Sequence, residues 1–259
     1  MTATGPALIA LDFDGVIADA LEECALVTWF GVRDFDRTLG GARQLRGVPQ
    51  EFIERFAGVR DYSRLLDHFV VAHLPSAGAV SSQRDFDRLF AELSSEFVRA
   101  FTEKATATRE WLRTREPDFW LDLHTLHPGI GELLRRFDGA AVVVTAKDAE
   151  SVRAILARHG LDGTVAEIIG ECGHKAEAVR EVAGRWEILP RDIVFIDDNL
   201  TNALRVAETG ADSRWAQWGY QTPEHRAEAA RRSPAPLRLD ELASLAPRVP
   251  PVRRPARAG

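Results

Sequence analysis

Several polar residues stand where apolar segments of the sequence end or where the next segment begins. They are Asp12, Asp14, Thr145, Lys175, Asp197 and Asp198. Carboxylates held within a few ångströms of one another repel strongly unless a divalent cation lies among them, and their hard oxygen ligands favour Mg²⁺. With the positive charge of Lys175, such a cation suits a phosphoryl group, whose transfer depends on charge neutralisation and in-line positioning. A carboxylate in this setting can be the nucleophile.

The apolar segments that position these residues have the pattern of buried strands. They are short and continuous, and helical periodicity separates them. The expected strands are 7–11, 141–145, 165–169, 193–197 and, with a weaker pattern, 212–216. The expected helices are 129–137, 148–159, 174–186 and 199–209. This alternation predicts an α/β fold with a parallel sheet, whose functional surface lies at the carboxyl ends of the strands.

The alternation stops between residues 18 and 124, where no buried strand is indicated and apolar residues follow helical spacing. After Ser81-Ser82, the apolar stripe from Phe86 to Phe101 predicts one long helix. We therefore expect a catalytic core made of residues 1–17 and 125–246, with an all-helical cap over 18–124. Residues 247–259 mix Pro and Arg without periodicity and are expected to form a mobile tail.

Four short motifs in this chain resemble, in order and spacing, those of the haloacid dehalogenase superfamily. They are Leu11-Asp-Phe-Asp-Gly-Val16, Val144-Thr145, Lys175 and Phe195-Ile-Asp-Asp-Asn199. The resemblance spans roughly residues 7–17 and 126–245, and it is closest to capped phosphatases of the phosphoglycolate phosphatase-like branch. It implies a Rossmann-like three-layer core with a helical cap inserted after the first motif, which agrees with the insertion found from periodicity.

The resemblance also implies a role for each matching residue. Asp12 would be the nucleophile and Asp14 the general acid and base. The phosphate would be held by Thr145, Ala146 and Lys175. The metal ligands would be Asp12, Asp198 and the backbone carbonyl of Asp14. Asp197 would support the metal or its waters, and Asn202 would be a further supporting residue of the site.

Asp14 separates the branches of this family, because halide-displacing members typically lack the second aspartate and a phosphate ester needs a proton on its leaving oxygen. Phosphonate cleavage through a Schiff base is disfavoured, because Lys104 is the single lysine of the expected cap and lies far from the first motif. Three arginines flank glycines that interrupt the expected helices of the cap. They could bind a second anionic group of the substrate. They are Arg43, Arg46 and Arg60.

The net charge of −6 supplies no basic field for a nucleic acid or an anionic membrane, so the expected partner is a small phosphorylated metabolite. Two distant cysteines fit reduced thiols, and neither a secretory signal nor a membrane-spanning run is indicated. We expect a cytoplasmic monomer or homodimer with Mg²⁺ as its cofactor.

The leading hypothesis is Mg²⁺-dependent hydrolysis of a small-molecule phosphate monoester through an aspartyl-phosphate at Asp12. A phosphomutase or phosphotransferase acting on a phosphorylated sugar would share the first half-reaction, and the sequence does not separate the two. A non-catalytic phosphate-binding regulatory module is a third alternative, which the complete motif set disfavours.

Overall fold

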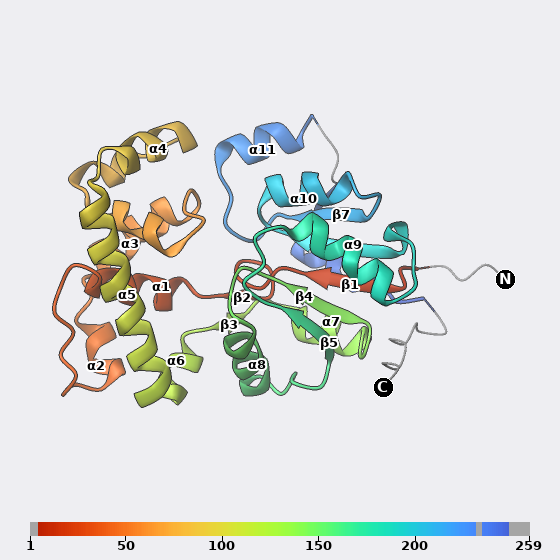
Figure 1. Ribbon diagram of the computed structural model, residues 1–259, viewed down its shortest axis with the longest axis horizontal. Coiled ribbons are helices and arrows are strands. Elements are labelled where there is room, and N and C mark those ends of the chain that lie inside the picture. Colours follow the sequence, from red (N-terminus) through yellow and green to blue (C-terminus); the bar gives the residue numbers. More distant parts are fainter. Residues whose placement is uncertain (1–4, 232–234, 249–259) are drawn as a thin grey trace. The chain divides into compact units, whose positions relative to one another are not determined.

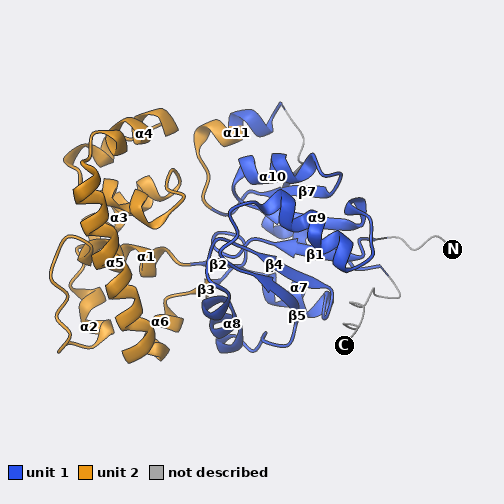
Figure 2. Ribbon diagram, in the orientation of Figure 1, with its two compact units in different colours: residues 1–19, 126–219, 227–259 blue, residues 20–125, 220–226 orange. Residues whose placement is uncertain are grey.

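Two compact units make up the chain. The computed structural model describes residues 5–231 and 235–248. The first unit takes its described residues from 1–19, 126–219 and 227–259, and the second consists of 20–125 and 220–226 (Figures 1 and 2). The sequence analysis assigned 220–226 to the core, whereas these residues cluster with the helical unit. Of the expected tail, residues 249–259 lie outside the described residues.

The first unit is built on a six-stranded parallel sheet with the strand order β5-β4-β1-β6-β7-β8. The strands are β1 (Leu8–Leu11), β4 (Ala141–Val144), β5 (Val165–Ile169), β6 (Ile193–Asp197), β7 (Asp212–Ala216) and β8 (Ala235–Leu237). Two further strands, β2 (Ala18–Asp19) and β3 (Thr125–Leu126), form a separate two-stranded sheet. The α/β class and parallel sheet predicted from the sequence are confirmed.

The sixth strand, β8, was not predicted from the sequence. It pairs with β7 and carries Pro236 opposite Trp215. Proline cannot donate to a sheet ladder, so it is confined to edge strands and weakens the strand pattern. Since β8 is the last strand of the sheet, Pro236 is tolerated there.

Helices between the strands occupy the segments where they were expected. They are α7 (Ile130–Arg136), α8 (Ala149–Arg158), α9 (Lys175–Arg185) and α10 (Leu200–Ala207), with shorter 3₁₀ turns at Pro190–Asp192 and Leu239–Ser244. Alternate strand residues such as Leu8 and Ala10 pack in one buried cluster with Val179 and Val182 of α9. The intervening residue Ile9 is also fully buried, so both faces of β1 are covered.

The sheet register sets where the polar ends of the strands fall. Leu11, the last residue of β1, pairs with Val143 on one side and with Ile196 on the other. The backbone N–H of Asp12 donates to the carbonyl of Ile196 at 2.9 Å. The residues that follow these pairs, Asp12 and Asp197, are therefore neighbours at the carboxyl edge of the sheet.

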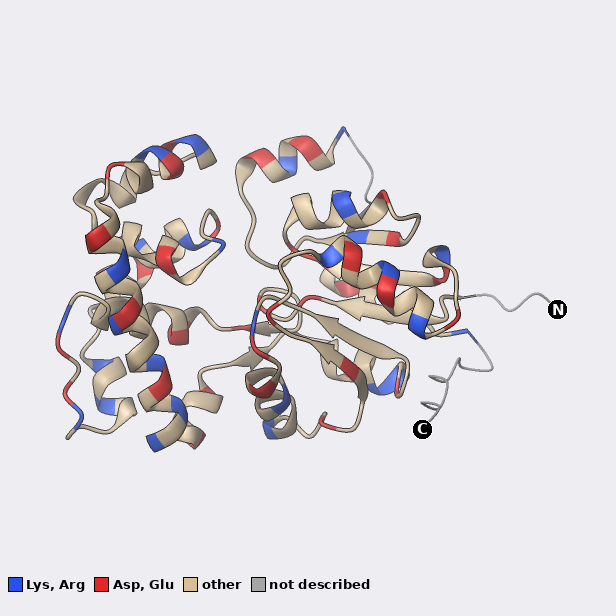
Figure 3. Cartoon of the chain, viewed as in Figure 1, with Lys and Arg blue, Asp and Glu red and all other residues tan. Residues whose placement is uncertain are grey.

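The second unit is helical. It contains α1 (Leu21–Phe30), α2 (Gly41–Arg46), α3 (Gln50–Arg60), α4 (Gln83–Ala91), α5 (Ser95–Arg115), α6 (Pro117–Asp122) and two 3₁₀ helices, Leu66–His73 and Pro75–Ala79. A last helix, α11 (Pro223–Ala229), begins in this unit and ends in the first. Acidic and basic residues are interspersed along the helices of both units (Figure 3).

The single long helix expected from Phe86 to Phe101 is wrong, because the segment forms two helices, α4 and α5. The break falls at Ser94, whose hydroxyl accepts from the backbone N–H of Phe97 at 3.2 Å and caps α5. Serine favours an N-cap because its side chain satisfies a backbone donor that the helix leaves unpaired. The apolar stripe crosses this break, so periodicity alone could not reveal it.

A buried ion pair holds three helices of the second unit together. Glu23 of α1 is fully buried and binds Arg109 of α5 through both oxygens, at 2.7 and 3.0 Å. Trp120 of α6 donates its ring N–H to the same carboxylate at 3.4 Å. Removing one partner of such a pair typically costs about 3–5 kcal/mol, because the other charge stays buried.

Residues 220–226 are fixed to the second unit by contacts with its helices. The N–H of Gln221 donates to Asp61 at 3.2 Å, and the guanidinium of Arg60 lies 3.7 Å from the ring centroid of Tyr220. The N–H of Gln83 donates to Glu224 at 2.9 Å. The chain therefore passes between the units at 19/20, 125/126, 219/220 and 226/227.

Acid is expected to destabilise the second unit through His73. Its ring Nε2 lies 2.7 Å from the carbonyl of Thr28, and burial, with a smaller contribution from Arg33 and Arg55, lowers the pKa of His73 to about 4. The unfolded chain, with a histidine pKa near 6.5, then binds more protons than the folded chain between those values. Stability is complete above about pH 6.5 and falls by up to about 3 kcal/mol as the pH drops toward 4.

Denaturant unfolding at pH 7 and pH 5 tests this expectation. His73→Gln retains a donor for Thr28 but cannot be protonated, so its stability is expected to vary less with pH than that of the wild type. Equal pH dependence in the two proteins would show that His73 is not the group responsible.

Cys24 and Cys172 are not joined in a disulfide. In the part of the chain that the structure describes, no helix combines the length and apolar character needed to cross a membrane.

Candidate active site

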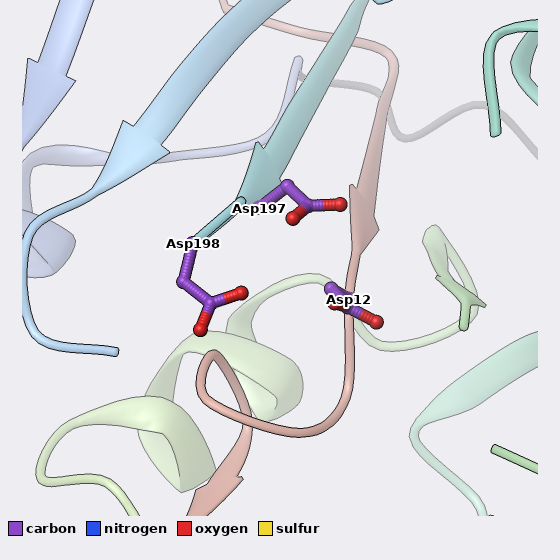
Figure 4. A group of neighbouring side chains, drawn as sticks. All are labelled: Asp12, Asp197 and Asp198. Carbon is purple, nitrogen blue, oxygen red and sulfur yellow. The ribbon is translucent and has the colours of Figure 1, made fainter. Parts of the chain in front are cut away.

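Three carboxylates meet at the carboxyl edge of the central strands (Figure 4). Asp12 follows β1, Asp197 ends β6, and Asp198 is the next residue. Each offers an oxygen, and these oxygens all lie within 4.8 Å of one another. All three side chains are buried or nearly so. The sequence analysis expected these residues in one pocket, and the structure brings them together.

Lys175, the first residue of α9, lies between two of these carboxylates. Its Nζ is 2.7 Å from Asp12 Oδ2 and 2.8 Å from Asp197 Oδ2. Burial alone would lower the pKa of Lys175, but the two carboxylates outweigh it and raise that pKa above its ordinary value. A cation at a helix N-terminus is disfavoured by the helix dipole, so these carboxylates are what stabilise the charge there.

Asp197 is completely buried, and several donors hold it. In addition to Lys175, it accepts from the backbone N–H of Asn199 at 2.8 Å and from the side-chain amide of Asn202 at 3.3 Å. Burial raises the pKa of Asp197 to about 6; Lys175 opposes this rise and Asp12 adds to it. Asp197 therefore has a fixed position, and Asn202 contributes to fixing it.

Asp14 lies in the tight loop between β1 and β2. Gly15 adopts a left-handed conformation with φ of +84°, and its N–H donates to the carbonyl of Ala18 at 2.8 Å. Glycine adopts this conformation without the steric cost that other residues have. The Asp14 carboxylate contacts Lys147, whose Nζ lies 3.2 Å from Oδ1.

The loop after β4 carries Thr145, Ala146 and Lys147. Thr145 is buried, and its hydroxyl oxygen accepts from the N–H of Lys147 at 3.2 Å, which leaves its own hydrogen to donate. Ala146 is exposed. The loop packs so closely against Gly170 that a Cβ there would lie 2.5 Å from the backbone nitrogen of Ala149.

Two residues beside Asp198 were not found from the sequence. A Cβ at Gly219 would lie 2.5 Å from Asp198 Oδ2 and even nearer to the carbonyl oxygen of Gly15. The ring N–H of Trp215 donates to the backbone carbonyl of Asp198 at 2.8 Å. Gly219 lies three residues after the end of β7 and belongs to no recognised motif. Its closeness to Asp198 is therefore visible only in the folded structure.

The donor set fits a hard divalent cation. Oxygens of Asp12, Asp197 and Asp198 lie within 4.8 Å of one another, and Lys175 is in ionic contact with Asp12. Because Gly219 lacks a side chain, both the Asp198 carboxylate and the carbonyl oxygen of Gly15 can lie close to it. Several carboxylates with one lysine leave net negative charge that a cation would balance.

The three arginines proposed to read the substrate all lie in the second unit. Arg43 and Arg46 are exposed on α2. Arg60 ends α3, where it donates to the carbonyl of Ser63 at 3.0 Å and stacks on Tyr220. Arg60 therefore takes part in fixing residues 220–226 within that unit.

A parallel α/β core with carboxylates and a lysine at its carboxyl edge defines a Rossmann-like protein with a candidate metal and phosphate site. The family model described as haloacid dehalogenase-like hydrolase matches residues 6–207. The chain therefore belongs to this hydrolase family, and the resemblance noted from its four motifs is confirmed. No curated protein matches the chain.

Solved structures share this fold at low sequence identity. A predicted phosphoglycolate phosphatase from Haemophilus somnus is 17% identical, with a TM-score of 0.62 over 93% of this chain and 98% of that one. A predicted phosphatase from Clostridium acetobutylicum is 15% identical, with a TM-score of 0.60 over 93% and 98%. A haloacid dehalogenase-like family protein from Streptococcus pneumoniae is 16% identical, with a TM-score of 0.57 over 91% and 96%.

Proposed function

We propose that the chain hydrolyses a small-molecule phosphate monoester with the help of Mg²⁺, through an aspartyl-phosphate at Asp12. The observation that carries this proposal is the convergence of Asp12, Asp198 and Lys175 at one edge of the sheet. Two similar structures are described as predicted phosphatases, which supports the same class of reaction. The proposed partner is a small phosphorylated metabolite, and the proposed compartment is the cytoplasm.

In the first half-reaction, a carboxylate oxygen of Asp12 forms a bond to phosphorus while the bond to the ester oxygen breaks. Asp14 gives a proton to the departing oxygen, so the alcohol leaves neutral. Lys175, already in contact with Asp12, holds a positive charge beside the developing negative charge of the phosphoryl oxygens. Thr145 and the backbone of Ala146 would donate to the same oxygens.

In the second half-reaction, a water oxygen attacks phosphorus and Asp14 accepts its proton. The bond between phosphorus and Asp12 breaks, which releases inorganic phosphate and restores both carboxyl groups. Bound Mg²⁺ would be held by Asp12, Asp198 and the backbone carbonyl of Asp14, and it would neutralise phosphoryl charge.

A panel of phosphorylated metabolites tests this function directly. With Mg²⁺ present, released phosphate is measured alongside transfer to sugar acceptors. Hydrolysis predicts release without an acceptor requirement, whereas a mutase or phosphotransferase predicts transfer. Neither release nor transfer, combined with saturable binding of phosphorylated ligands, would instead support a regulatory module.

Replacement of Asp14 by alanine is expected to separate the proton donor from the nucleophile. An alkyl phosphate has a poor leaving group that needs a proton, whereas an aryl phosphate barely needs one. The ratio of alkyl to aryl turnover is expected to fall by about a hundred- to ten-thousandfold, the usual size of general acid catalysis.

The second half-reaction gives an independent measurement on the same variant. Without Asp14, attack by water slows, so phosphorylated enzyme is expected to accumulate with the aryl substrate and to be visible by intact mass. Equal losses on both substrates without accumulation would reduce Asp14 to a structural role.

A further inference from the structure

Lys147 has no part in the reaction proposed above, yet it lies in ionic contact with the proposed general acid and base. Its Nζ is 3.2 Å from Oδ1 and 3.4 Å from Oδ2 of Asp14. The side chain of Lys147 is 11% exposed and that of Asp14 is 28% exposed. The pair is therefore largely withdrawn from water, unlike solvent-exposed ion pairs, whose contribution is usually small.

The backbone of Lys147 is held on both sides. Its N–H donates to the hydroxyl of Thr145 at 3.2 Å, and its carbonyl accepts from the N–H of Glu171 at 3.1 Å. A Cβ on Gly170 would lie 2.8 Å from that same carbonyl oxygen, so the loop is packed directly against the end of β5. The Lys147 side chain thus extends toward Asp14 from a backbone position that is fixed against the sheet.

Asp14 lies in the short loop between β1 and β2. Its neighbour Gly15 has a positive φ, and the loop backbone is closed by hydrogen bonds from Gly15 to Ala18 and from Ile17 and Ala18 to Phe13. An aspartate side chain has several staggered rotamers, so its backbone conformation alone does not select the orientation of the carboxylate. A cation on both of its oxygens restricts those rotations.

We propose that Lys147 is a positioning residue that holds the Asp14 carboxylate in the orientation needed for proton transfer. This inference rests on the proposed function and extends it to a residue outside the four motifs. The chain has three lysines, and two of them each pair with one of the proposed catalytic carboxylates. Lys175 contacts Asp12, and Lys147 contacts Asp14.

The first test measures turnover of an alkyl phosphate by variants of this lysine. Lys147→Met is expected to lower kcat about ten- to hundredfold with little change in KM, since small misplacements of a catalytic group have effects of that size. Lys147→Arg keeps the charge and is expected to restore part of the loss. Lys104→Met is the matched control, because Lys104 forms an exposed ion pair with Asp34. It is expected to leave kcat unchanged.

The second test asks whether Lys147 acts through Asp14. In an Asp14→Ala background, where no carboxylate remains to be oriented, Lys147→Met is expected to change turnover of the same alkyl phosphate less than about twofold. Non-additivity of this kind is the signature of two residues in one interaction. The same fold-loss in both backgrounds would overturn the inference, because it would mean that Lys147 acts on the substrate or the fold independently.

A crystal structure of Lys147→Met provides a readout that needs no substrate. The Asp14 side chain is expected to change its conformation or to become disordered, while Asp12 and Asp198 keep theirs. An unchanged Asp14 would overturn the inference even in a protein that shows no turnover. Absence of phosphate release from the wild type, in contrast, contradicts the proposed function and leaves this structural comparison decisive for Lys147.

Discussion

Asp12→Asn is expected to reduce phosphate release by several orders of magnitude. The substitution keeps the shape of the side chain but replaces the attacking carboxylate with a weakly nucleophilic amide. It also removes a negative charge from beside Lys175, which lies 2.7 Å away. The measurement is steady-state phosphate release with saturating Mg²⁺ on the best substrate of the metabolite panel.

Asp240→Asn is a matched control, because Asp240 is exposed, forms an ion pair with Arg238 and has no part in the proposed reaction. It is expected to retain wild-type turnover. Intact mass after brief exposure to substrate should show a phosphorylated species in the wild type and none in Asp12→Asn. Retention by Asp12→Asn of more than about a tenth of wild-type kcat, a loss of less than about 1.4 kcal/mol, would remove Asp12 from the mechanism.

Removal of Mg²⁺ is expected to abolish turnover, and its addition to restore it. Asp12 and Asp198 supply hard oxygen ligands at one point, and without a cation their charges repel both each other and a phosphoryl group. Activity measured in excess chelator and after Mg²⁺ is returned tests this dependence. Asp198→Ala is expected to need far more Mg²⁺ for half-maximal activity.

Thermal unfolding tests cation binding at Asp198 without a substrate. A cation that binds only the folded chain raises the unfolding temperature as its concentration rises. This rise is expected in the wild type and in the Asp240→Asn control, and it is expected to be absent in Asp198→Ala. Full activity in excess chelator, or a bound cation located away from Asp12 and Asp198, would contradict the assignment.

The core could be predicted in some detail because its signals are local. Three of the strands, β1, β4 and β6, are short apolar runs that end in or are followed by a polar residue, so Asp12, Thr145 and Asp197 mark the carboxyl edge even before the order of the strands is known. The parallel register then brings Asp12 and Asp197 together. The edge strand β8 was missed because Pro236 weakens the strand pattern of its sequence.

Contacts between residues distant in sequence could not be predicted in the same way. Lys147 could not be assigned a role from the sequence, because nothing in its own segment indicates that it contacts Asp14. Glu23 and Arg109 are far apart and look like ordinary surface charges of two helices until packing buries them. Gly219 resembles any loop glycine, and its closeness to Asp198 is a property of the folded chain alone.

The central position of β1 has a consequence for how the protein is made. Among the strands of its sheet, β1 is synthesised first, and both strands that flank it, β4 and β6, begin about 130 residues or more after Leu11. At typical rates of synthesis, that separation is a delay on the order of ten seconds, during which residues 20–125 of the helical unit can already form their own core. Meanwhile Leu8–Leu11 presents apolar side chains and unpaired backbone, a combination prone to aggregation. Asp12, the proposed nucleophile, is therefore translated before the strands that flank it, and it can reach its place beside Asp197 only after Asp197 has been added to the chain.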